Sequence, residues 1–215
     1  MRQQVYLAIA FGADNLQYYC YAVPRTQLDD GSVKYLYNHC MLNHDGTPNQ
    51  LYYDVKTVNN EIQKFASAVL AYNWQQSIGV SGTEDQTFRV ASIEYDKDFN
   101  RITEFDSDNN YVSSTSSYDM VVSHFASEEF GNAYMFVNFS RNDGINNKIS
   151  ATFKDFARES EVPNKVTATF KDCGAVAIYG GAGYSGTPEI IKLDEEGKFS
   201  LELQYGEGVF VVPLA

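Results

Sequence analysis

The chain has 215 residues, of which 44% are hydrophobic, so it is long enough to bury a core and does not have the composition of a disordered protein. Its 28 acidic and 16 basic residues give a formal net charge of −12, which repels phosphate backbones and anionic lipid head groups. We therefore expect no nucleic-acid partner. We expect no membrane partner either, since no apolar stretch approaches the ~20 residues needed to span a bilayer.

The first part of the chain predicts a helix followed by a strand. Residues 2–11 are compatible with a helix, and Gly12 stands where a helix would end. Residues 16–21 form an apolar, tyrosine-rich run that is typical of a strand. A loop rich in Asp, Gly, Asn and His follows over residues 24–46.

A second, longer helix is predicted after this loop. Thr47 suits the N-cap, Pro48 suits the first helical position, and Gln50 lies three residues after the cap, where it completes a capping box. Apolar residues from Leu51 onward recur at the spacing of one buried stripe. The helix is therefore expected to continue to about Tyr72.

Beyond Trp74 the hydrophobic period changes from that of a helix to that of a strand. Short segments alternate between apolar and polar residues and are separated by turns rich in Asn, Asp, Gly and Ser. This pattern predicts an antiparallel β-sandwich, either jelly-roll or immunoglobulin-like. The expected strands are residues 87–95, 102–105, 118–125, 133–139, 148–153, 165–170, 175–179, 189–193, 199–204 and 209–212.

Several sequence blocks resemble one enzyme family. Residues 2–21 read R-Q-Q-V-Y-L-A-I-A-F-G-A-D-N-L-Q-Y-Y-C-Y, and residues 43–62 read N-H-D-G-T-P-N-Q-L-Y-Y-D-V-K-T-V-N-N-E-I. Both blocks resemble the end of a (β/α)8-barrel glycoside hydrolase of the β-galactosidase type. The runs A-Y-M-F-V-N-F at 133–139 and Y-G-E-G-V-F-V at 205–211 are similar to the small β-domains that follow such barrels.

The resemblance implies a division of the chain and a location for the chemistry. Residues 1–76 would be a helix–strand–helix remnant of the barrel, with residues 16–21 as its last strand, and residues 77–215 would be the accessory β-sandwich. In this family two carboxylates carry out glycoside hydrolysis. The resemblance places both of them on strands that would precede Met1, so no catalytic residue is expected in this chain.

Three residues are candidates for contact with carbohydrate. Tyr21, at the end of the predicted last barrel strand, could face a sugar together with Arg25, because active sites of such barrels gather at the ends of the strands. Trp74 is expected to be exposed and to stack on a sugar face if the chain is a carbohydrate-binding module. The alternative for Tyr21 and Arg25 is a role in the core or in loops. Glu61 is expected to be solvated or to pair two helices, and not to be an acid catalyst.

No cofactor and no metal are expected. The sequence G-A-G-Y-S-G at residues 181–186 matches a dinucleotide-binding fingerprint, but a strand and not a helix is predicted to follow it. The loops that start at Asp96 and Asp106 open like calcium loops but lack the required Gly and Glu, so hairpin turns are expected. His39, Cys40 and His44 lack a fourth ligand for a metal.

The cysteines favour a reducing compartment. Cys20, Cys40 and Cys173 are odd in number and far apart in sequence, so three free thiols are expected and the cytoplasm is favoured.

Three functional hypotheses stay open at this point. The first is a non-catalytic C-terminal part of a glycoside hydrolase with an accessory sandwich. The others are a stand-alone carbohydrate-binding module, and an interaction domain that self-associates through the barrel remnant.

Overall fold

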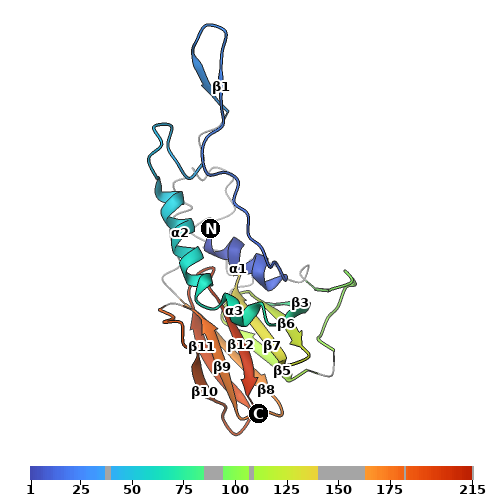
Figure 1. The fold of residues 1–215 in the computed structure, drawn as a ribbon. Coiled ribbons are helices and arrows are strands. Elements are labelled where there is room, and N and C mark those ends of the chain that lie inside the picture. The colour runs from blue at the N-terminus through green and yellow to red at the C-terminus, as the bar shows by residue number, and fades with distance from the viewer. Residues whose placement is uncertain (37–39, 85–93, 107–108, 140–162, 182, 215) are drawn as a thin grey trace.

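The computed structural model describes residues 1–36, 40–84, 94–106, 109–139, 163–181 and 183–214. Within these residues the chain forms two antiparallel sheets, a separate hairpin and three helices (Figure 1). The helices are α1 (Arg2–Ala10), α2 (Gln50–Gln63) and α3 (Ala66–Val69). None of the helices in this part of the chain is both long enough and apolar enough to cross a bilayer.

The larger sheet has seven strands. In spatial order they are β10 (Glu189–Lys192), β9 (Ala175–Gly180), β12 (Gly208–Leu214), β7 (Gly131–Asn138), β6 (Met120–Ser127), β3 (Asn73–Val80) and β4 (Tyr95–Asp96). The smaller sheet is β11 (Lys198–Leu203), β8 (Asn164–Phe170) and β5 (Tyr111–Ser116). A largely exposed hairpin of β1 (Arg25–Gln27) and β2 (Val33–Tyr35) projects away from both sheets (Figure 1).

One hydrophobic core lies between the two sheets. Strand β8 shows how it is made, because Val166, Ala168 and Phe170 are buried while Lys165 is exposed. These residues pack in one cluster with residues of the large sheet, including Met120 and Val211. The predicted mainly-β, antiparallel architecture is confirmed.

A second core lies on the opposite face of the large sheet, where the helices cover it (Figure 1). Adjacent residues of β6 take part in different cores, since Val121 faces the helices and Val122 faces the small sheet. Both side chains are fully buried. The central strands are therefore buried on both faces, and the molecule has three layers, which are helices, the seven-stranded sheet and the three-stranded sheet.

Residues 16–21 form no strand, contrary to the prediction. They run as an extended segment beside α2, and only the end of the segment meets another piece of extended backbone. There Met41 N donates to Cys20 O at 3.3 Å and Leu42 N donates to Tyr21 O at 2.9 Å. The tyrosine-rich composition suits a strand, but a strand needs sheet neighbours on which to form a ladder.

The second predicted helix is present but starts later and is broken. Asn49 caps α2, with its side chain accepting from Tyr52 N, while Thr47 is held in the preceding turn by the carboxylate of Asp45. A local Asx-type turn thus competes with the predicted cap. The helix ends at Gln63, and the short α3 follows it.

Seven predicted strands match β6 to β12. Residues 102–105 form no strand, residues 148–153 lie outside the described residues, and of residues 87–95 only the end is described, where Tyr95 belongs to β4. The prediction missed β3 and β5, and it assigned the residues of β1 and β2 to a loop. Strand β3 covers Asn73–Val80 and so runs across the expected boundary between residues 76 and 77.

Candidate functional site

A groove runs between the extended segment 16–21 and one face of α2. Its volume is about 530 Å³. The segment 16–21 forms one wall and α2 forms the other, and we call this hollow the α2 groove. It is lined by Leu16, Gln17, Tyr18, Tyr21, Met41, Tyr52, Val55, Lys56, Asn59, Asn60 and Gln63.

Helix periodicity explains why α2 presents polar groups to the groove. Tyr52, Lys56, Asn59 and Gln63 are spaced by three or four residues, so they lie along one face of the helix. Val58, on another face, is buried in the core beneath the helices. The same helix therefore anchors itself on the sheet and supplies one wall of the groove.

A hydrogen bond joins the two walls. The hydroxyl of Tyr18 donates to Oδ1 of Asn59 at 2.7 Å. A tyrosine hydroxyl carries its proton at neutral pH and can donate, and partial burial raises the pKa of Tyr18 further above its ordinary value. This bond holds the extended segment at a fixed distance from α2 although the segment has no sheet neighbours along most of its length.

Tyrosine rings gather at the end of the groove near Tyr21. The ring of Tyr21 meets that of Tyr52 edge-on, with centroids 6.4 Å apart, and Tyr52 in turn meets Tyr53 at 5.3 Å. Tyr21 is 55% exposed. Because these rings meet edge to face, their flat surfaces point in different directions. Each ring combines an apolar surface with a hydroxyl group.

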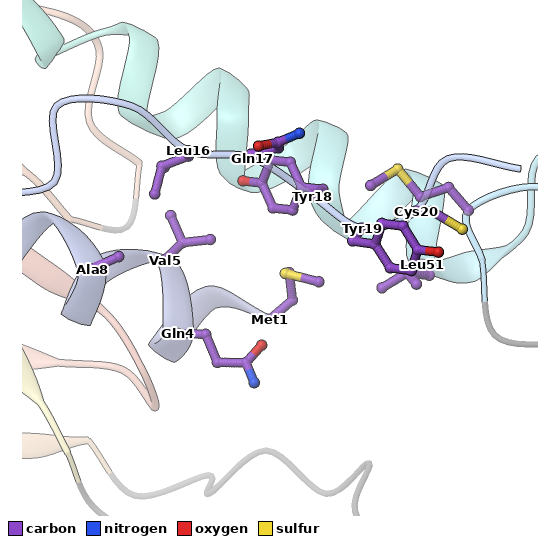
Figure 2. A pocket seen from close by; sticks show the side chains of 11 residues that line it. Met1, Gln4, Val5, Ala8, Leu16, Gln17, Tyr18, Tyr19, Cys20 and Leu51 are labelled. Carbon is purple, nitrogen blue, oxygen red and sulfur yellow. The ribbon is translucent and has the colours of Figure 1, made fainter.

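A smaller pocket of about 300 Å³ lies on the other side of the same wall (Figure 2). Figure 2 shows Leu16 on the extended segment facing Val5 on α1, with Met1 between α1 and Leu51. This pocket is lined mostly by apolar side chains. Tyr18 and Leu16 line both hollows, so the segment 16–21 is a wall between two cavities.

A third pocket, of about 290 Å³, lies where α2 meets the loop after β9. Glu61 lines it and forms an ion pair with Arg2 of α1, in which Arg2 Nε donates to Glu61 Oε2 at 3.1 Å. Of the two roles expected for Glu61, which were solvation and the pairing of two helices, the structure shows the second. Lys64 donates to the backbone oxygen of Tyr184 at 2.8 Å, and burial together with the nearby Glu61 raises the pKa of Tyr6.

The three carbohydrate candidates are not brought together. Tyr21 lies in the α2 groove. Arg25 lies in β1 on the exposed hairpin, opposite Tyr35, and is not among the residues that line the groove. Trp74 is partly buried in the core beneath the helices, with its ring beside Phe11, and Trp74 Nε1 donates to Ser77 Oγ at 2.8 Å.

The groove also contains residues that the sequence analysis did not select. Asn59 and Gln63 are polar residues of α2 that were not among the predicted site residues. The signal that could have identified the groove is the spacing of Tyr52, Lys56, Asn59 and Gln63, which places a tyrosine, a cation and two amides on one face of α2.

The metal candidates take other roles. Among the described residues, no group of three or more His, Cys, Asp and Glu side chains could hold a metal ion. His44 stacks on Tyr35 with ring centroids 3.7 Å apart, and His39 lies outside the described residues. Asp96 accepts from the backbone N–H groups of Asp98 and Asn100, which is the hairpin turn that was expected.

The glycine-rich sequence after β9 is a loop between two strands. Gly181, Gly183 and Gly186 all have positive φ, and β10 follows and pairs with β9. The prediction that a strand follows this sequence is confirmed, since the next described element is β10 and not a helix.

Comparison of the chain with protein-family models, with curated proteins and with solved structures finds no match.

Proposed function

We propose that this chain is a non-catalytic accessory part of a glycoside hydrolase and that it binds carbohydrate in the α2 groove. The observation that carries the binding proposal is the placement of the exposed ring of Tyr21 and the ring of Tyr52 in one groove with the amide side chains of Asn59, Asn60 and Gln63. Sugars present apolar C–H faces and a rim of hydroxyls. Tyrosine rings suit the faces, and amides both donate to and accept from the hydroxyls.

The size and charge of the groove fit an uncharged ligand. Its volume of about 530 Å³ lies within the range of about 300 to 1,000 Å³ that is common for small-molecule sites. Of the described residues that line the groove, Lys56 alone carries a charge. A single cation in a chain of net charge −12 provides little attraction for anions, so neutral sugars suit the groove better than phosphorylated ones.

The glycoside hydrolase assignment rests on the sequence resemblance. Under this proposal, residues 1–76 derive from the end of a (β/α)8 barrel, and residues 77–215 form an accessory sandwich of jelly-roll or immunoglobulin-like type. The chain is then catalytically silent by itself. The purified chain should give no turnover of aryl β-galactosides, and measurable turnover that persists in independent preparations would contradict the assignment.

Calorimetric titration tests the binding proposal. The ligands are galactose, lactose and a panel of neutral oligosaccharides, and the variants are Tyr21→Ala, Gln63→Ala and Tyr95→Ala. Tyr95 is a matched control, because it is exposed like Tyr21 but lies on β4, away from the groove. We expect saturable binding that weakens about tenfold or more in Tyr21→Ala, by loss of one stacking ring. Tyr95→Ala should bind like the unmodified chain.

Two outcomes would count against the groove. Absence of saturable heat with every sugar would reject carbohydrate binding by this chain. Binding that survives in both Tyr21→Ala and Gln63→Ala would place the sugar elsewhere.

Self-association through residues 1–76 is a second candidate function. It is favoured by the mostly apolar pocket between α1 and the extended segment, where Val5, Leu16 and Leu51 are among the lining residues (Figure 2). Light scattering over a wide range of protein concentrations tests it. Self-association predicts a mass that rises with concentration and a weaker rise in Leu51→Asp, whereas a constant monomer mass would exclude it.

A further inference from the structure

Two cysteines that are 20 positions apart in sequence meet at the wall of the α2 groove. Cys20 Sγ and Cys40 Sγ are 3.1 Å apart. Both carry thiols in this structure, and a disulfide bond measures roughly 2 Å between the sulfurs, so about 1 Å of approach separates the pair from bonding distance. Cys173, the third cysteine, lies in the turn between β8 and β9.

The backbone around the pair is aligned independently of the sulfurs. Two hydrogen bonds, Met41 N to Cys20 O and Leu42 N to Tyr21 O, join the two segments directly beside the thiols. On the other side, Asn49 Nδ2 donates to Cys40 O at 2.6 Å. Backbone hydrogen bonds therefore hold the two segments side by side at the point where the sulfurs meet.

We propose that Cys20 and Cys40 form a reversible disulfide, a modification site that fastens the wall of the α2 groove to the segment leading into α2. The bond would close a loop that contains the exposed β1–β2 hairpin. The disulfide proposal does not depend on carbohydrate binding, because its test measures only the thiol state of the chain.

The reaction balances with a low-molecular-weight disulfide such as oxidised glutathione as the oxidant. Cys20, which is partly exposed, attacks as a thiolate and forms a mixed disulfide with one glutathione, and the second glutathione leaves as a thiolate. Cys40 then attacks Cys20 Sγ and displaces the bound glutathione. Two thiol protons pass to the two glutathione thiolates, and the two electrons reduce the glutathione disulfide.

Burial explains why the two cysteines take these different parts. Cys40 is 1% exposed, and burial together with the adjacent Cys20 raises the pKa of its thiol to about 11. A buried thiol with a raised pKa is a poor first nucleophile for a solution disulfide. It becomes an effective second nucleophile once Cys20 is activated, because the two sulfurs are already in contact.

The test counts thiols on the whole chain. The protein is equilibrated with reduced or oxidised glutathione, denatured in iodoacetamide and weighed by mass spectrometry. We expect three alkylated cysteines after reduction and one, Cys173, after oxidation, with an intramolecular link between Cys20 and Cys40 and a chain mass lower by about 2 Da before alkylation. The oxidised chain should also melt at a higher temperature, because the cross-link reduces the conformational entropy of the unfolded chain.

Two variants serve as controls. Cys173→Ser should oxidise like the unmodified chain, and Cys20→Ser should keep Cys40 as a free thiol and lose the redox-dependent change in melting temperature. The proposal is overturned if all three thiols remain alkylatable at every glutathione ratio, or if Cys20 carries glutathione and the closing step does not follow. A link that includes Cys173 would overturn it as well.

Discussion

At the scale of the residue, the imidazole of His124 is buried in an environment that supplies one polar partner. Its Nε2 lies 2.9 Å from Asn132 Oδ1, and its ring packs beside Tyr134 and Phe105. Among the described contacts its Nδ1 has no hydrogen-bond partner. Burial lowers the pKa of His124, against a smaller opposing effect of Asn132 and of the negative charge of Asp106.

This burial predicts a loss of stability in mild acid. The folded-state pKa lies below the unfolded value of about 6.5, so the unfolded chain binds the proton first as the pH falls. The contribution of neutral His124 is therefore fully present above about pH 6.5 and declines as the pH falls toward the folded-state pKa. Urea unfolding of the unmodified chain and of His124→Gln at pH 7.5 and pH 5.5 measures the effect. The decline should be smaller in His124→Gln, while His44→Gln, which removes an exposed imidazole, should keep it.

An equal decline in all three proteins would show that carboxylates, and not His124, control the acid response. The negative charge of Asp106 raises the pKa of His124, and the Asp106 carboxylate accepts from Gln76 Nε2. Asp106→Asn therefore separates the two contributions, because it removes the charge near the imidazole and retains a side-chain oxygen in a similar position.

Single residues also show how far the candidate site could be predicted. Tyr21 was identified because a tyrosine at the end of a predicted strand suggests contact with a ligand. Trp74 was also predicted to stack on a sugar, but its ring packs against Phe11. Whether an aromatic ring is exposed depends on which elements cover it. Residues next to α1 cover Trp74, and α1 is separated from Trp74 by more than 60 positions in sequence. Composition therefore could not distinguish the exposed Tyr21 from the covered Trp74.

At the scale of the element, α1 ends as predicted, and its end is closely packed. Gly12 has φ of +79°, and its N–H donates to Ile9 O at 2.8 Å, which is a common glycine C-terminal arrangement. A Cβ placed on Gly12 would lie 2.6 Å from Trp74 Cβ. The glycine therefore serves both the backbone conformation and the contact with β3.

Two glycine substitutions separate these requirements. Gly31 has a similar φ of +82°, but a Cβ there would meet nothing within 4 Å. We expect Gly31→Ala to cost about 1 kcal/mol through the left-handed backbone alone, and Gly12→Ala to cost more because Trp74 must also move. Urea unfolding measures both. Equal losses of unfolding free energy in the two variants would mean that Trp74 moves aside without a cost, and that the close contact at Gly12 does not affect stability.

Elements were predictable where one face is apolar and the other polar. Strands β8 and β11 follow this rule. Strand β3 does not, because Gln76 and Ser77 are buried in it and are satisfied by distant partners, with Ser77 Oγ 2.8 Å from Ser123 Oγ. Residues 16–21 are the converse case, with the composition of a strand but no sheet beside them. In both cases the decisive partner lies outside the local sequence.

At the scale of the whole molecule, the seven-stranded sheet is shared by two hydrophobic cores. The helices of residues 1–76 pack on one face and the three-stranded sheet packs on the other. A sheet whose central strands are buried on both faces couples the two sides, since loss of either layer exposes apolar side chains of the same strands. This arrangement favours unfolding of the described layers in one cooperative transition.

Val121 and Val122 test this coupling, because they are adjacent in β6 and point into different cores. Each is fully buried, so truncation to alanine should cost about 1 to 3 kcal/mol at either position. Unfolding is followed by circular dichroism and by fluorescence of Trp74, the single tryptophan, which reports on the helix side. Both variants should shift both signals together. If Val121→Ala shifted only the fluorescence transition and Val122→Ala only the circular dichroism, the helical layer and the sandwich would be independent folding units, and the boundary near residue 76 would mark a true division of the chain.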